Sequence, residues 1–255
     1  MTIFVISAPR SGLNWTRFCV EYFYGLRTPG KPLLLDDEAG APVFLRTHDA
    51  LLLTKRRSRK EILAKLKTTL RLSSNAAEQG ARTTRPAGSG AYKLLNPAEM
   101  EGHKVLLILR DPLETFVRMA RKSYPRFVSY TGNIRFFQRA ATDDKMVVYY
   151  DEIVGQPEKM FQALEFLGLE PAGDRSPPTL EEIHAKWSEA GQASRALYGR
   201  NQWHSGGART KRTPLDFKFH QRKLSEAQKL AVWRHLDDVL SEPELALIER
   251  FRPRS

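Results

Sequence analysis

The segment from Ile3 to Tyr24 joins a short apolar run to a helical pattern through the turn sequence Pro9-Arg10-Ser11-Gly12. This arrangement predicts a buried strand, a loop and a helix in immediate succession. The N-terminus of such a helix presents backbone N–H groups and the positive end of the helix dipole, which together bind phosphate or sulfate. Arg10 and Ser11 add a guanidinium and a hydroxyl to the same loop. The segment therefore predicts an anion-binding loop and a nucleotide ligand.

Three further apolar runs have the length of buried strands, and helical patterns separate most of them. They are Pro42 to Arg46, Lys104 to Leu109 and Lys145 to Tyr150. A helix start follows the second run at Asp111-Pro112, and a helix from Pro157 to a terminating Gly168 follows the third. This alternation predicts an α/β protein with a parallel sheet flanked by helices.

The polar residues that follow these strands point to one common site. Ligands of open parallel sheets bind at the carboxyl ends of the strands. The loop from Pro9 to Gly12, His48 and Arg110 each come directly after a predicted strand or close to its end. We therefore expect them to face one cleft.

Composition and charge narrow the class of partner. The 41 lysines and arginines against 29 acidic residues leave a net charge of +12, which favours nucleotides, acidic glycans, nucleic acids or membrane headgroups. A chain of 255 residues with 41% hydrophobic content predicts one domain, residues 1–255. No stretch resembles a signal peptide or a membrane span, so we expect a cytoplasmic protein.

Cysteine and histidine usage gives two further expectations. The single cysteine, Cys19, excludes an internal disulfide, and we interpret it as a core residue. The six histidines show no close pairing of the metal-ligand type. We therefore predict no metal.

Two regions interrupt the alternation of strands and helices. Lys55 to Arg71 predicts a basic amphipathic helix, either a solvated face or part of a site, and Ser73 to Gly90 predicts a mobile loop. Together they form an insertion at about residues 54–93. Nearer the C-terminus, Ser225 and Gln228 predict a capping box that starts a helix. We expect that helix to turn four side chains toward the core, namely Leu230, Trp233, Leu236 and Leu240.

The loop sequence APRSGLNW indicates which nucleotide-binding class the chain resembles. It lacks the lysine and the glycine spacing of a Walker loop, and it lacks the G-x-G-x-x-G pattern of dinucleotide folds. It resembles the loop PKSGTTW or PRSGTTW with which PAPS-dependent sulfotransferases hold the 5′-phosphosulfate of 3′-phosphoadenosine 5′-phosphosulfate (PAPS). Five residues match: Pro9, Arg10, Ser11, Gly12 and Trp15. Leu13 and Asn14 stand where the family commonly has two threonines.

Three more segments resemble the family, in the family's order along the chain. FLRTHDALLL is similar to the strand end at which a histidine acts as general base beside a basic residue, here His48 and Arg46. LILRDPLETFVRMARKSY is similar to the segment that holds the 3′-phosphate. Arg110 matches its arginine, whereas Arg118 stands at the position of its serine.

The last similar segment is VVYYDEIVGQPEKMFQALEFLGLE, in which Tyr150 stands near the family's nucleotide contact. Lys211-Arg212 lies roughly where the family's RKG loop returns to the 3′-phosphate. The resemblance covers most of the chain from Ile3 to Glu170 and is weaker in the C-terminal third.

The resemblance implies a sulfotransferase fold with a P-loop-like nucleotide-binding architecture. It implies transfer of a sulfuryl group from PAPS, as co-substrate, to a hydroxyl acceptor such as a glycan or a secondary metabolite. His48 is then the general base, and Arg10 and Arg46 neutralise the charge that grows during transfer. The residues expected to bind PAPS are Arg10, Ser11, Gly12, Leu13, Asn14, Trp15, Arg110, Arg118, Tyr150, Lys211 and Arg212.

Two other functions fit parts of the sequence: a P-loop-like small-molecule kinase, and a non-enzymatic protein that binds nucleic acid or an anionic surface. Structural roles also remain open for single residues. His48 can cap a strand end, Arg110 can pair with Asp111 or Glu114, and Arg118 can lie on a solvated helix face. Trp15 and Tyr150 can be core aromatics rather than nucleotide contacts. The sequence does not identify the acceptor or the oligomeric state.

Overall fold

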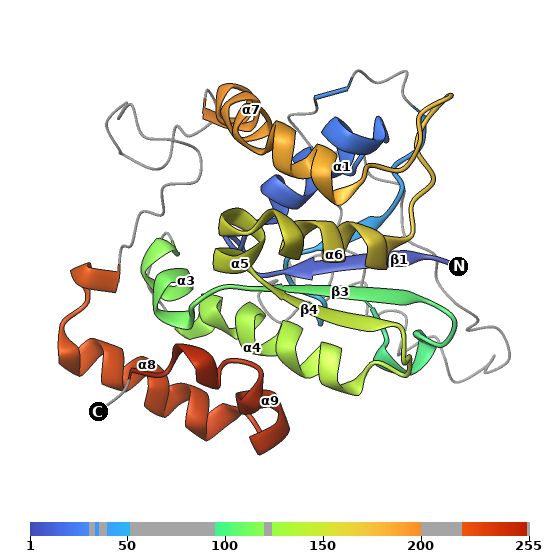
Figure 1. Cartoon of the computed structure of the whole chain (residues 1–255). Coiled ribbons are helices and arrows are strands. Elements are labelled where there is room, and N and C mark those ends of the chain that lie inside the picture. The colour runs from blue at the N-terminus through green and yellow to red at the C-terminus, as the bar shows by residue number, and fades with distance from the viewer. Residues whose placement is uncertain (31–33, 36–39, 52–94, 120–123, 200–220, 254–255) are drawn as a thin grey trace, which may run out of the picture.

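The computed structural model describes residues 1–30, 34–35, 40–51, 95–119, 124–199 and 221–253. Its 4-stranded sheet has the strand order β2-β1-β3-β4, and every neighbouring pair is parallel. The strands are β1 (Ile3–Ser7), β2 (Leu45–Thr47), β3 (Lys104–Leu109) and β4 (Lys145–Tyr149). The predicted α/β class and parallel sheet are confirmed (Figure 1).

Helices follow the strands along the chain. The α-helices are α1 (Leu13–Tyr24), α3 (Pro112–Arg118), α4 (Tyr124–Arg139), α5 (Tyr150–Gly155), α6 (Pro157–Leu167), α7 (Leu180–Gly199), α8 (Glu226–Val239) and α9 (Glu242–Ala246). Short 3-10 helices are η1 (Pro97–Glu99), η2 (Gln221–Lys223) and η3 (Glu249–Phe251).

The helices cover both faces of the sheet (Figure 1). Along β1, Phe4 and Ile6 face the core built with α3, α4 and α8, whereas Ile3 and Val5 face the core built with α1, α6 and α7. This alternation is the period of two that a strand buried on both faces requires. The fold therefore has three layers, with the sheet in the middle.

Strand β2 begins later than the predicted strand, Pro42 to Arg46. Pro42 has no N–H to donate, and Val43 donates its N–H to the carbonyl of Arg27 at 3.0 Å rather than to β1. The ladder therefore starts at Leu45, which is paired with Phe4. The fourth strand also ends one residue before its predicted end, because Tyr150 already belongs to α5.

The predicted helix ends are confirmed at three places. Asp111 caps α3 by accepting hydrogen bonds from two backbone amides. Gly168 ends α6 in the left-handed conformation, with φ 62°. Ser225 and Gln228 form both hydrogen bonds of the capping box that starts α8.

The expectation that Leu230 faces the core is wrong, because its side chain is 53% exposed. The other three side chains are buried as expected, and Val232 joins them. Val232, Leu236 and Leu240 form one row along the helix at a spacing of four residues. Leu230 precedes this row by two residues, which turns it by about 200° around the helix axis.

Several sequence predictions lie outside the described residues. They are the basic helix Lys55 to Arg71, the loop Ser73 to Gly90, and the pair Lys211 and Arg212. Cys19 is buried in α1, as expected for a core residue. Within the described ranges, no helix is both long enough and apolar enough to cross a membrane.

Candidate functional site

The carboxyl ends of the strands bring the predicted site residues to one edge of the sheet. The anion loop (Pro9 to Gly12) lies just beyond the end of β1, and His48, Arg110 and Tyr150 come directly after β2, β3 and β4. Because all neighbouring strands are parallel, these four positions share an edge.

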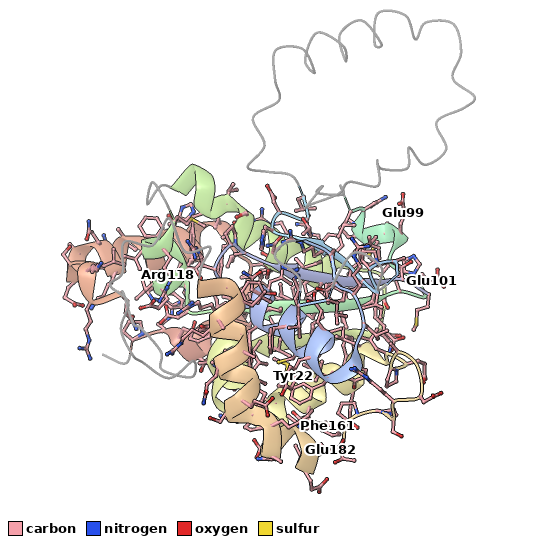
Figure 2. The ribbon with its side chains drawn as sticks, turned by 90° about the horizontal axis from the view of Figure 1, so that it is seen from above. Tyr22, Glu99, Glu101, Arg118, Phe161 and Glu182 are labelled. Atoms are coloured by element: carbon pink, nitrogen blue, oxygen red, sulfur yellow. The ribbon has the colours of Figure 1, made fainter. Side chains whose placement is uncertain are left out.

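Figure 2 labels charged side chains near both ends of the sheet. Arg118, at the end of α3, lies at one end of the molecule, and Glu99 and Glu101 lie at the other. Glu99 and Glu101 precede β3 and so belong to the amino end of the sheet. Arg118 belongs to the carboxyl end, where the anion loop also lies.

The anion loop turns sharply before α1 begins. Ser11 donates its N–H to the carbonyl of Ala8 at 3.2 Å, so Pro9 and Arg10 occupy the centre of a turn. Arg10 has φ 73° and is the non-glycine residue with positive φ in the described chain. A side chain in this region costs roughly 1–2 kcal/mol, which is the kind of local strain that accumulates at functional sites.

The start of α1 has the groups that an anion requires. Gly12, with φ 102°, stands at the N-cap and provides no side-chain cap, so the first-turn amides have no such partner. The Ser11 hydroxyl is buried, with 1% of the residue exposed, and Ser11 Oγ has no hydrogen-bond partner. An unpartnered buried hydroxyl is costly unless a ligand satisfies it. Arg10 and Asn14 are exposed beside it.

Two loop residues assigned to the nucleotide contribute mainly to the core. Leu13 is 3% exposed and Trp15 is 9% exposed, and both belong to the apolar core on the α1 side. The Trp15 indole N–H donates to the carbonyl of Ile153 at 2.7 Å, and its ring packs against Phe18 and Trp187. These contacts favour the core role for Trp15. Leu13 contributes its backbone amide to the anion site.

His48 is tethered to the strand that leads into the anion loop. Its Nδ1 lies 2.9 Å from the carbonyl oxygen of Ser7, so Nδ1 carries the proton and donates it. Nε2 is then the basic nitrogen of the ring. Asn133 fixes the backbone on either side by donating to the carbonyl of His48 at 3.1 Å and accepting from the N–H of Ala50 at 2.9 Å.

The surroundings keep the imidazole neutral. Burial lowers the pKa of His48 below its usual 6.5, and the positive charges of Arg46 and Arg17 lower it further, against the opposing effect of the Ser7 carbonyl. A neutral imidazole is the form that can accept a proton. The arrangement therefore suits a general base that works near neutral pH.

Arg46 and Arg17 lie near enough to His48 for their charges to lower its pKa. The Arg46 guanidinium packs against Gly30, where an added Cβ would meet its Nη2 at 2.6 Å. Arg17 is fully buried in α1 and donates to Asn14 Oδ1 at 3.3 Å and to Thr28 Oγ1 at 3.0 Å. Arg17 thus orients the side chain of Asn14 at the anion loop.

Arg110 joins the anion loop to α5. Its Nη1 donates to the carbonyl of Arg10 at 3.0 Å, and its Cζ lies 4.1 Å from the ring centroid of Tyr150. The Tyr130 hydroxyl donates to the carbonyl of Arg110 at 2.7 Å. The Tyr150 ring also contacts the loop, because a Cβ added to Gly12 would lie 2.5 Å from Tyr150 Cδ2.

Glu114 holds the two arginines assigned to the 3′-phosphate. The Glu114 Oε2 lies 3.0 Å from Arg118 Nε and 3.8 Å from Arg110 Nη2, and Oε1 accepts the backbone N–H of Gln221 at 2.7 Å. Glu114 is only 1% exposed, so this pairing is well shielded from solvent. The pairing between Arg110 and Glu114 that the sequence left open is therefore present.

Sequence reasoning missed Ser7, Arg17 and Asn133 as residues of the site, and named Glu114 only as a possible partner of Arg110. The spacing of four residues between Arg17 and Glu21, and between Glu114 and Arg118, was a usable sign of an ion pair on a helix. Nothing local marks Asn133, which reaches His48 across 85 positions of sequence. Lys211 and Arg212 lie outside the described residues, so the structure places neither.

The described part of the chain contains no group of three or more histidine, cysteine, aspartate or glutamate side chains that could hold a metal ion. A comparison with protein-family models finds no match, and a comparison with curated proteins finds no matching relative.

Proposed function

We propose that this protein transfers a sulfuryl group from PAPS to a hydroxyl acceptor, on a P-loop-like fold of the sulfotransferase type. The observation that carries the proposal is the hydrogen bond from His48 Nδ1 to the Ser7 carbonyl. Ser7 ends the strand that continues into the anion loop, so the basic nitrogen lies beside a place built for an anion. Sulfuryl transfer requires this combination of a base and an anion site.

The anion loop fits the 5′-phosphosulfate. The buried Ser11 hydroxyl without a partner and the uncapped first turn of α1 supply neutral donors, and Arg10 supplies a positive charge. PAPS, when bound, supplies the sulfuryl group and a phosphate leaving group. Donors fixed in place before the reaction stabilise the charge that grows on that phosphate.

His48 performs the proton transfer. Its Nε2 takes the proton of the acceptor hydroxyl while the acceptor oxygen forms a bond to sulfur. The bond between sulfur and the 5′-phosphate oxygen breaks, and 3′,5′-ADP leaves with the electron pair. General-base catalysis of this kind contributes about 10²- to 10⁴-fold to the rate.

Arg110 and Arg118 are proposed to hold the 3′-phosphate. Arg118 replaces a serine, and a guanidinium binds phosphate more strongly than a hydroxyl does. In the described structure it pairs with Glu114 at 3.0 Å, so a phosphate would share this arginine with a carboxylate. Lys211 and Arg212 remain part of the same proposal.

The direct test is incubation with PAPS and a panel of hydroxyl acceptors, including sugars, phenols and lipids, with 3′,5′-ADP release as the readout. We expect turnover with one class of acceptor and a loss of about 10² or more in kcat for His48→Ala. Turnover of Mg-ATP instead would favour a kinase. Binding to DNA with a steep salt dependence, unchanged in His48→Ala and without nucleotide affinity, would favour a non-enzymatic protein.

A further inference from the structure

The C-terminal 3-10 helix η3 contacts the segment that carries Tyr150. Arg250 forms ion pairs with Glu152, through Nη1, and with Asp151, through Nη2 at 3.4 Å. Its Cζ lies 4.1 Å from the ring centroid of Tyr149. Arg250 therefore contacts three residues of the β4–α5 junction at once.

A second contact joins the same two segments. The Tyr149 hydroxyl donates to the carbonyl of Leu247, just before η3, at 3.0 Å. The Tyr149 ring also packs edge-on against Phe251, with ring centroids 5.7 Å apart. The C-terminal segment thus contacts Tyr149 at its hydroxyl and at its ring.

Tyr150 lies between Tyr149 and Asp151 in the sequence, and its ring packs against the opposite core from the ring of Tyr149. Its ring lies against Gly12 of the anion loop and under the guanidinium of Arg110. Helix α5 has only 6 residues, and so short a helix has little rigidity of its own. Its position must come from tertiary contacts. Tyr149, which Arg250 contacts, packs against one core of the protein, and Tyr150 packs against the other.

We propose that Arg250 is a positioning residue that holds Tyr150 against the anion loop and Arg110, so that the C-terminal segment sets the affinity of the nucleotide site. The link to the nucleotide rests on the function proposed above. Arg250 is more than 230 positions away from the loop in sequence, and among the described residues its contacts toward the loop run through residues 149–152.

Arg252 provides a matched control on the same segment. It is 33% exposed, against 37% for Arg250, and it also pairs with two carboxylates, Asp237 at 2.6 Å and Glu249 at 2.7 Å. It also stacks on an aromatic ring, with Cζ 4.4 Å from the Trp233 centroid. These partners belong to α8 and η3, and none belongs to α5. A substitution at Arg252 therefore removes the same kinds of contact without releasing Tyr150.

The test measures the Kd of 3′,5′-ADP for the wild type, Arg250→Gln and Arg252→Gln. We expect Arg250→Gln to raise the Kd about 3- to 10-fold, within the range for residues that act on a site without touching the ligand. We expect Arg252→Gln to leave the Kd within about twofold of the wild-type value. Glu152→Gln should raise the Kd similarly, and the double variant Arg250→Gln/Glu152→Gln should bind no worse than either single variant. Equal Kd values for the wild type and Arg250→Gln, or equal losses for the two arginine variants, overturn the proposal.

Hydrogen exchange in the ligand-free protein separates this proposal from the proposed function. We expect the α5 backbone amides to exchange faster in Arg250→Gln than in the wild type, and at the wild-type rate in Arg252→Gln. If the wild type does not bind 3′,5′-ADP, the nucleotide assignment is rejected, and the exchange rates alone decide whether Arg250 holds α5. Unchanged exchange in Arg250→Gln overturns the positioning role.

Discussion

Arg110 donates a hydrogen bond from Nη1 to the backbone carbonyl of Arg10 at 3.0 Å, and so ties the end of β3 to the anion loop at the end of β1. Arg110 is also 7% exposed and stacked on Tyr150. A residue that we assign to a remote phosphate thus also supports the loop that holds the reacting end of the nucleotide.

Arg110→Ala is expected to raise the Kd of 3′,5′-ADP about tenfold or more, because a hydrogen bond to a charged group contributes roughly 1.5–3 kcal/mol. The Kd of 5′-AMP, which lacks the 3′-phosphate, should also rise, because the Arg10 carbonyl loses its donor. The rate at saturating PAPS should change much less, since most of the lost interaction is uniform binding. Isothermal titration with both nucleotides checks this prediction, and an unchanged Kd for 5′-AMP would show that Arg110 does not support the loop.

Gly12→Ala is expected to destabilise the protein by about 2 kcal/mol or more, because it adds a clash to an unfavourable backbone conformation. Gly12 has φ +102°, and its new Cβ would lie 2.5 Å from Tyr150 Cδ2. Gly102 is the control, since it also has positive φ, +68°, but no atom within 4 Å of an added Cβ. Gly102→Ala should cost about 1 kcal/mol. Urea unfolding of both variants measures the difference, and equal losses would show that Tyr150 is not packed on the loop.

The strands of the sheet could be predicted from the sequence because each predicted strand is an apolar run that ends at a polar residue or a turn. The runs at β1 and β3 are buried on both faces, which makes them continuous apolar segments. The run at β4 is half-buried but still apolar. The edge strand β2 has only 3 residues, and its start is set by the hydrogen bond from Val43 to Arg27, which no local pattern reveals. Leu230 was misassigned for a similar reason, because an apolar residue near a helix N-terminus can lie beside the buried stripe rather than in it.

The site residues that directly follow a strand could be predicted from the sequence. The residues that orient them through long-range contacts could not. His48 and Arg110 were found from their positions after strands, which the parallel topology brings together. The side chains that orient them come from far along the chain: Asn133 on α4 holds His48, and Tyr130 holds Arg110. The sequence around a polar residue inside a helix does not indicate which distant residue its side chain will contact.

Stability should depend on the ionisation of Asp111, since burial raises its pKa from 3.8 to about 6. A raised pKa in the folded state means that folding favours the protonated carboxyl, so this contribution to stability is present at low pH and is lost as the pH rises through about 6. Asp111→Asn keeps an N-cap acceptor but cannot ionise. The stability of the wild type relative to Asp111→Asn should therefore fall by about 2 kcal/mol between about pH 4 and pH 7. Urea unfolding across this range checks it, and a difference independent of pH would contradict the raised pKa.

The pH dependence of turnover tests the neutral state of His48. Its pKa is lowered by burial and by neighbouring positive charges, so kcat/KM should rise with pH through one ionisation below 6.5 and level off by neutral pH. The free energy of unfolding should change with pH in the same direction as the rate. Because folding lowers the pKa of His48, the stability that is present above about pH 6.5 is lost as the pH falls toward the folded pKa. A rate that still rises above pH 7 by a single ionisation would assign the base to another group.

The most direct measurement is a calorimetric titration of the wild-type protein with 3′,5′-ADP, with 5′-AMP and Mg-ATP titrated in parallel. We expect 3′,5′-ADP to bind most tightly, by at least about tenfold over 5′-AMP, because only the former places a second phosphate at Arg110. At a concentration of about 100 times its Kd it should also stabilise the fold by about 2.7 kcal/mol. Equal affinity for 3′,5′-ADP and 5′-AMP, or binding of Mg-ATP alone, would contradict a site built for PAPS.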